Sequence, residues 1–63
     1  MPVVKVSIFA DRTKEQKLKI AQAITKSLAE VLNISASHVH VIFESIPRDD
    51  WVIGGTSCSE LKF

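Results

Sequence analysis

Two apolar strand patterns on either side of one helix pattern constrain the fold of this chain more than any other feature. Residues 3–9 are rich in Val, Ile and Phe, which is typical of a β-strand. A helical period follows to about residue 32, and residues 38–46 predict a second strand. Strand, long helix and strand together predict an α/β (α+β) fold built on a β-α-β unit, with parallel strands and a right-handed crossover.

Both ends of the predicted helix are marked by local signals. Residues 13–16 (TKEQ) fit a capping box, in which Thr13 and Gln16 each bind the backbone of the other. Asn33 can end the helix in a left-handed conformation. Apolar side chains share one side of the helix and charged side chains the other, so we expect the helix to cover one face of a sheet. The apolar side contains Ile20, Ala21, Ile24, Leu28, Val31 and Leu32.

The end of the chain predicts a short C-terminal β-hairpin. Residues 47–50 (PRDD) break the strand pattern and are expected to form a solvated loop. Residues 51–53 (WVI) are apolar, and Gly54-Gly55 favours a tight turn. Residues 56–63 then form a tail with another edge segment.

The small size of the chain predicts an oligomer. Its 63 residues make a single domain, residues 1–63. A core of this size rarely contributes more than about 3–5 kcal/mol on its own. Cys58 is the one cysteine, so no intramolecular disulfide is possible, and we expect it to be a small packing residue. Because 46% of the residues are apolar and the first strand has apolar groups on both faces, subunits are expected to cover one another.

Charge and composition disfavour several classes of partner. The net charge is +1 and the basic residues are scattered, which does not favour nucleic acid. No apolar run approaches the ~20 residues that a membrane span needs. Lys5 interrupts the first apolar run and Asp11 follows it, so no signal peptide is expected, and the free cysteine fits the cytoplasm. His38 and His40 lack a thiolate cluster, and no metal site is predicted.

The proline at the second position has two interpretations. If Met1 is removed, Pro2 becomes the N-terminus and its nitrogen is a free secondary amine. An α-amino group has a pKa of about 7.7–8.0, burial lowers it, and a base near the working pH suits proton transfer. Alternatively, Pro2 simply starts a strand, where its missing N–H costs little, and by itself this stretch favours that interpretation.

Several motifs, each short and weak alone, together resemble the 4-oxalocrotonate tautomerase family over essentially the whole chain. This family consists of small enzymes with a β-α-β unit. The resemblance rests on Pro2, on residues 11–17 (DRTKEQK), on residues 39–44 (VHVIFE) and on residues 51–55 (WVIGG).

The resemblance implies a cofactor-free isomerase that interconverts enol and keto forms of a small 2-oxo acid, such as a 2-hydroxydienoate. Family members lose Met1 and use the amine of Pro2 as the general base. They are usually hexamers whose sites combine neighbouring subunits, so we expect a homohexamer acting on a small carboxylate substrate without a cofactor or a metal.

The resemblance also assigns the substrate-binding residues. Arg12 matches the arginine that binds a substrate carboxylate, and Trp51 matches an aromatic position in the apolar pocket. Phe9 and Ile53 are the other candidates for lining this pocket. Without the resemblance, Arg12 would be read as an ordinary loop residue and Trp51 as an interface anchor.

One position departs from the family pattern. His40 stands where the family tautomerase has a second arginine, which binds the 2-oxo group and the adjacent carboxylate. Histidine lacks the permanent charge and the two-pronged donor geometry of arginine, although it can donate one hydrogen bond. This difference argues against a dicarboxylate substrate more than it argues against proton-transfer chemistry. Arg48 is a possible replacement cation, although a loop arginine is more often solvated.

Two alternatives remain open from the sequence. A dehalogenase or hydratase of the same superfamily would use a protonated Pro2 and a carboxylate that activates water, and Glu44, Asp49 and Asp50 have no assigned place in that role. A non-catalytic oligomeric binding protein on this fold would explain His40 as a sign of lost function.

Overall fold

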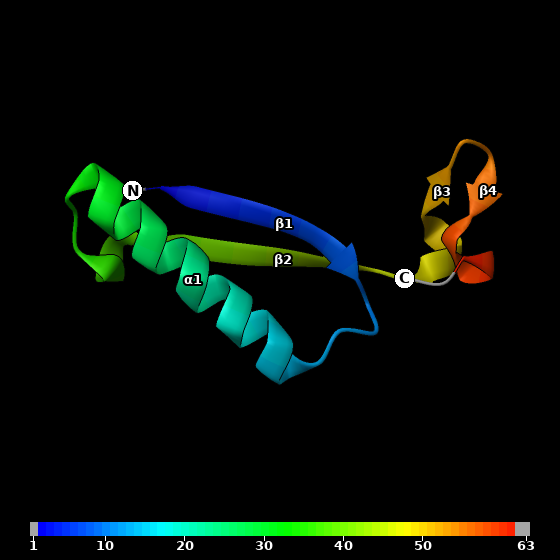
Figure 1. Cartoon of the computed structure of the whole chain (residues 1–63), viewed down its shortest axis with the longest axis horizontal. Helices are drawn as coiled ribbons and strands as arrows, with labels where there is room; N and C mark the ends of the chain where they lie inside the picture. The colour runs from blue at the N-terminus through cyan, green and yellow to red at the C-terminus, as the bar shows by residue number, and fades with distance from the viewer. Residues whose placement is uncertain (1, 62–63) are drawn as a thin grey trace.

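The computed structural model describes residues 2–61, which form a β-α-β unit followed by a small hairpin (Figure 1). Strand β1 (Val3–Phe9) leads into helix α1 (Lys14–Leu32), which returns the chain to strand β2 (His40–Ile46). The two strands are parallel, and the register places the first and last residues of β1 opposite those of β2. The predicted β-α-β unit with parallel strands is confirmed.

Local signals set both ends of α1. The Gln16 N–H donates to the Thr13 hydroxyl and the Thr13 N–H donates to the Gln16 side chain, both at 3.0 Å. Asn33 is left-handed, with φ 53° and ψ 50°, and its N–H donates to the Ala29 carbonyl. A good N-cap contributes typically about 1 kcal/mol. Among the described residues, no helix combines the length and the hydropathy that a bilayer crossing requires.

The second strand begins two residues later than predicted. Ala36–His38 form a one-turn 3₁₀ helix, and His40 is the first residue of β2. The Ser35 side chain accepts from the Ser37 N–H and caps this turn. A serine side chain that accepts from a nearby backbone N–H favours a turn over extended structure. The strand prediction used only the alternation of apolar residues, so it started too early.

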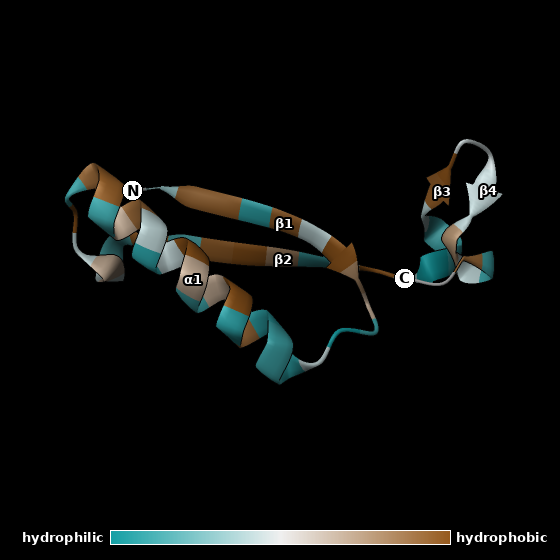
Figure 2. Cartoon of the chain, viewed as in Figure 1, coloured by the Kyte–Doolittle hydropathy of each residue, from teal (hydrophilic) through white to brown (hydrophobic). Residues whose placement is uncertain are grey.

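Helix α1 covers one face of the two-stranded sheet. The residues below it are half-buried, and Lys17 reaches across to the Ser45 hydroxyl at 3.3 Å. In Figure 2, brown hydrophobic segments make up most of both strands, interrupted by hydrophilic ones, and α1 runs alongside them. The half-buried strand residues on this face are Val4, Val6, Ile8, Val41 and Phe43.

The other face of the sheet is left open within one chain. Ile42, at the centre of β2, is 46% exposed, and Val3 is also exposed. The alternation between faces in β2 is the one predicted. The sequence predicts cover on both faces of the sheet, and a single chain provides it on one face alone. The open face consists of Val3, Lys5, Ser7, His40, Ile42 and Glu44.

The chain ends in the predicted hairpin. Strands β3 (Val52–Ile53) and β4 (Thr56–Ser57) pair in an antiparallel manner. Gly54 and Gly55 form the turn with φ values of 57° and 83°, a conformation that costs glycine least.

Cys58 anchors this hairpin to the rest of the C-terminal segment. Its N–H donates to the Trp51 carbonyl at 2.8 Å, and it begins a 3₁₀ helix, Cys58–Glu60. Within residues 2–61 it is the one side chain that is fully buried, which confirms its predicted packing role.

The protein is elongated for its size. The hairpin extends beyond the end of the sheet in Figure 1, and the chain measures 42 × 23 × 14 Å. Its radius of gyration is 14.4 Å, whereas a compact chain of this length would have about 11 Å. A single chain therefore does not enclose a full core of its own.

Candidate active site

Two loops meet at the carboxyl end of the sheet. Because β1 and β2 are parallel and in register, both strands end at this edge, and the Ala10 N–H donates to the Ile46 carbonyl at 2.9 Å. The second residue beyond each strand is Asp11 in one loop and Arg48 in the other. The Arg48 Nε donates to Asp11 Oδ2 at 2.9 Å, which joins the two loops.

Asp11 lies between two guanidinium groups. Its second oxygen, Oδ1, is 3.8 Å from the Nε of Arg12. The hydrogen bond from Arg48 lowers the pKa of Asp11 below its usual value, so the carboxylate is ionised at neutral pH. The Asp11 side chain is 55% exposed, and ion pairs at such positions contribute little to stability. The arrangement therefore matters mainly for the electrostatics of this corner.

Two aromatic rings complete the corner. The ring centroids of Phe9 and Trp51 are 4.6 Å apart, with the planes tilted by 52°. The Cζ of Arg48 lies 4.2 Å from the centroid of the Phe9 ring, within cation–π distance. We call Phe9, Asp11, Arg12, Arg48 and Trp51 the cationic–aromatic corner.

The expectation that the loop of Arg48 is solvated is wrong for its side chain. Arg48 is 21% exposed, and Arg48–Asp50 form a 3₁₀ helix. The partners that hold Arg48 in place are Asp11 and Phe9, which precede it by 37 and 39 residues, so local sequence does not reveal them.

The remaining candidate residues lie elsewhere in the chain. Val3 pairs with His40 at the start of both strands, and the His40 N–H donates to the Pro2 carbonyl at 3.0 Å. Pro2 and the cationic–aromatic corner are thus separated by the length of β1, about 20 Å at ~3.3 Å per residue. Ile53 is an exposed residue of the hairpin. Within one chain, Phe9, Arg12 and Trp51 lie together at one end of the sheet. Pro2 and His40 lie together at the other end.

Sequence analysis missed Asp11 as a site residue. The signal was present, because parallel pairing of residues 3–9 with residues 40–46 places the two following loops side by side. An acidic residue two positions after one strand and a basic residue two positions after the other then predict an ion pair.

A shallow hollow of about 460 Å³ lies along α1, away from this corner. The atoms exposed in it are mainly apolar, although Gln22, Lys26 and Glu30 also line it, and none of the predicted site residues does. Leu18, Ala21, Thr25 and Ala29 of α1 and Ala36 beyond it are among its lining residues. Within residues 2–61, no three His, Cys, Asp or Glu side chains are placed to hold a metal ion together.

The fold and this corner define a small β-α-β protein that buries little surface by itself. The family model described as tautomerase enzyme matches residues 2–61, and the chain belongs to the tautomerase family. The resemblance to 4-oxalocrotonate tautomerases is thereby confirmed.

Relatives in sequence and in structure agree with this assignment. The chain is 30% identical to a 2-hydroxymuconate tautomerase of Comamonas testosteroni over 61 residues, 97% of either chain. It is 42% identical to a probable tautomerase of Lactococcus lactis over 55 residues, 87% of this chain and 90% of the relative. The apo crystal structure of an unfused 4-OT superposes with a TM-score of 0.89 at 34% identity, covering 97% of this chain and all of that one.

Proposed function

We propose that this protein is a cofactor-free tautomerase that interconverts the enol and keto forms of a small 2-oxo acid resembling a 2-hydroxydienoate. Membership of the tautomerase family and the relation to 2-hydroxymuconate tautomerase support this function. The observation that carries the proposal is the cationic–aromatic corner, where the Arg48 guanidinium lies over the Phe9 ring, Trp51 packs beside that ring, and Arg12 lies next to Asp11. Such a corner suits a flat, conjugated, anionic molecule.

In this proposal, the amine of Pro2 is the general base. It takes the proton from the 2-hydroxyl group and returns a proton to a carbon of the conjugated chain, so the product differs from the substrate only in where that hydrogen sits. Enclosure of the amine in an apolar pocket between subunits would support this role, because desolvation disfavours the charged ammonium form. Arg12 holds the substrate carboxylate, and Phe9, Trp51 and Ile53 line the apolar part of the pocket.

The separation of Pro2 from the corner implies that a complete site uses more than one chain. We propose a homo-oligomer, a hexamer, in which Pro2 of one subunit faces the cationic–aromatic corner of a neighbour. The open sheet face and the protruding hairpin provide apolar surface for such contacts. A related 4-oxalocrotonate tautomerase of Chloroflexus aurantiacus, with a TM-score of 0.89 at 27% identity over 98% of this chain and all of that one, is a heterohexamer.

Turnover of a panel of 2-hydroxydienoates and phenylenolpyruvate tests the proposed function. Conversion of at least one of them, lost when the amine of Pro2 is blocked, is the expected result. Failure to convert any member, in protein that is folded and assembled, would favour the non-catalytic binding protein. Release of halide from a haloacrylate, with no tautomerase activity, would favour the dehalogenase.

Replacing Arg12 by alanine should weaken substrate binding more than the chemical step. Charge-assisted contacts to a carboxylate are strong, so we expect KM to rise, kcat to fall less, and kcat/KM to lose roughly 2–3 kcal/mol. Steady-state kinetics on a carboxylate substrate measures this change. Lys14→Ala, which removes an exposed cation at the start of α1, is the matched control. An unchanged KM for Arg12→Ala would reject the assignment of Arg12.

Replacing His40 by arginine should raise activity on a dicarboxylate 2-hydroxydienoate relative to a monocarboxylate one. Residue 40 lies on the open face next to Pro2, and a guanidinium there would stabilise enolate charge that develops as the proton leaves. The gain should therefore appear mainly in kcat.

Kinetics on both substrates measures the effect of His40→Arg, and sedimentation verifies that the variant still assembles. His38→Arg places the same group in the preceding 3₁₀ turn and should give no gain. If an assembled His40→Arg variant also shows no gain, residue 40 does not face the substrate.

A further inference from the structure

We propose that Asp11 is a specificity-determining residue. Its carboxylate offsets one of the two arginine charges in the cationic–aromatic corner, so that the corner favours substrates with one carboxylate over those with two. This inference rests on the proposed function and adds the class of substrate. Neither the resemblance nor the sequence pattern assigns Asp11 a role.

The geometry places Asp11 where it acts on both cations at once. One carboxylate oxygen is bound by the Arg48 Nε at 2.9 Å and the other lies 3.8 Å from the Nε of Arg12. The hydrogen bond from Arg48 lowers the pKa of Asp11, so its negative charge is present at neutral pH. Two guanidinium charges and one carboxylate leave a net charge of +1 in the corner.

The Arg48 guanidinium is held more firmly in place than that of Arg12. Its guanidinium is held on one side by the Phe9 ring at 4.2 Å and on another by Asp11, and the side chain is 21% exposed. Arg12 is more open, at 33% exposed. Arg12 therefore presents a larger exposed fraction of its side chain to an incoming carboxylate than Arg48 does.

The charges around the corner also disfavour a second substrate carboxylate. Asp49 and Asp50 follow Arg48 in the 3₁₀ helix and are exposed, so they add negative potential near the corner. In the oligomer that we propose, His40 of a neighbouring subunit would approach the corner together with Pro2, and histidine has no permanent charge where the family tautomerase has its second arginine. Within the corner itself, a second substrate carboxylate would thus meet no cation other than the two arginines that share the Asp11 carboxylate.

Asp11→Asn keeps the size of the side chain and removes its charge. We expect the ratio of kcat/KM for a dicarboxylate 2-hydroxydienoate to that for a monocarboxylate one to rise about twofold, the size of a unit-charge effect at roughly 8 Å in a well-solvated site. The gain should shrink as salt is added, because screening weakens interactions between exposed charges. A purely structural role of Asp11 would change both substrates alike and would not depend on salt.

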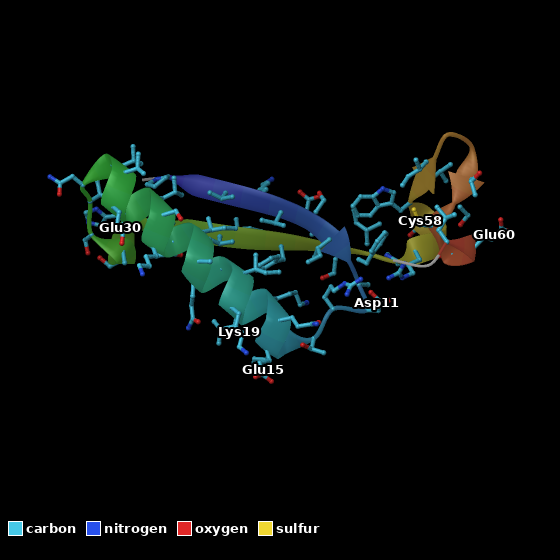
Figure 3. The ribbon with its side chains drawn as sticks, in the orientation of Figure 1. Asp11, Glu15, Lys19, Glu30, Cys58 and Glu60 are labelled. Carbon is cyan, nitrogen blue, oxygen red and sulfur yellow. The ribbon has the colours of Figure 1, made fainter. Side chains whose placement is uncertain are left out.

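Two further variants isolate the local charge. Glu15→Gln removes one negative charge from an exposed ion pair with Lys19 on α1, apart from Asp11 as Figure 3 shows, and should leave the ratio unchanged. The double variant Asp11→Asn/Arg48→Gln returns the corner to a net charge of +1, so its ratio should return close to that of the parent. A gain in Glu15→Gln as large as in Asp11→Asn, or a double variant that keeps the full gain, would overturn the proposal.

A binding measurement separates this inference from the proposed function. Calorimetric titration with adipate and with hexanoate, a saturated dicarboxylate and monocarboxylate of equal length, reports charge selectivity without any turnover. In Asp11→Asn, the affinity for adipate should rise relative to the affinity for hexanoate by a similar factor. If the parent converts its substrates and Asp11→Asn leaves both the kinetic and the binding ratio unchanged, the role of Asp11 is rejected while the tautomerase function stands. If the parent has no turnover, the binding ratio alone decides the inference.

Discussion

A form of the protein in which Pro2 carries an extra residue on its nitrogen should lose at least about 100-fold in kcat/KM, because general acid–base catalysis typically contributes 10²–10⁴-fold. Acylation turns the secondary amine into an amide without a basic lone pair. Pro2 immediately precedes β1, and its carbonyl accepts from the His40 N–H, so a residue added on the nitrogen leaves that hydrogen bond in place. The loss should therefore fall on kcat with little change in folding.

Intact mass decides which form is present, and the mature chain is expected to begin at Pro2. Two preparations are compared, one starting at Pro2 and one with a residue that is not removed. Pro2→Ala retains a primary amine in a more flexible residue and should fall between them. Full activity in protein that keeps Met1 on every chain would rule out the amine as the base.

Replacing Ile42 by glutamate should abolish assembly and, with it, activity. Ile42 sits at the centre of the open sheet face and is 46% exposed in a single chain, where a polar side chain would do little harm. In an oligomer that covers this face, the same change removes about 1.5–3 kcal/mol of apolar burial per subunit and places an unpaired charge in the interface. Sedimentation at micromolar concentration should show assembled parent and dissociated or unfolded variant.

The control for this experiment is Ala23→Glu, which adds the same side chain at an exposed position of α1. It should assemble and retain activity. A cooperatively folded monomer in the parent, or an Ile42→Glu variant that assembles normally, would contradict the oligomer that we propose.

Local chemistry made much of the fold predictable. Thr13 and Gln16 fix the start of α1 through two hydrogen bonds within three residues, and Asn33 ends it with its own backbone. Gly54 and Gly55 predict the hairpin because few other residues adopt positive φ readily. These interactions join residues near one another in sequence, so they can be recognised without the fold.

The contacts of the candidate site are of another kind. Arg48 is held by Asp11, 37 residues earlier, and by the Phe9 ring, and only the register of the parallel strands brings these groups together. Phe9 and Trp51 were both predicted as substrate-binding residues, and the structure places their ring centroids 4.6 Å apart, but their role stays a prediction. In the oligomer that we propose, the place of Pro2 relative to Arg12 depends on contacts between chains, which a single chain does not contain.

The elongated shape of the chain implies that the stability of the proposed oligomer depends on the concentration of the protein. Cys58 is the one fully buried side chain among residues 2–61, and in the oligomer that we propose other copies of the chain remove the exposed apolar side chains from water. The free energy of unfolding then includes a mass-action contribution and grows with protomer concentration. A change in the gene is also present in every subunit at once, so its effect on the assembly is multiplied by the number of copies. In the proposed oligomer, expression level and sequence therefore act on the same equilibrium, and dilution of the protein weakens it as a destabilising substitution does.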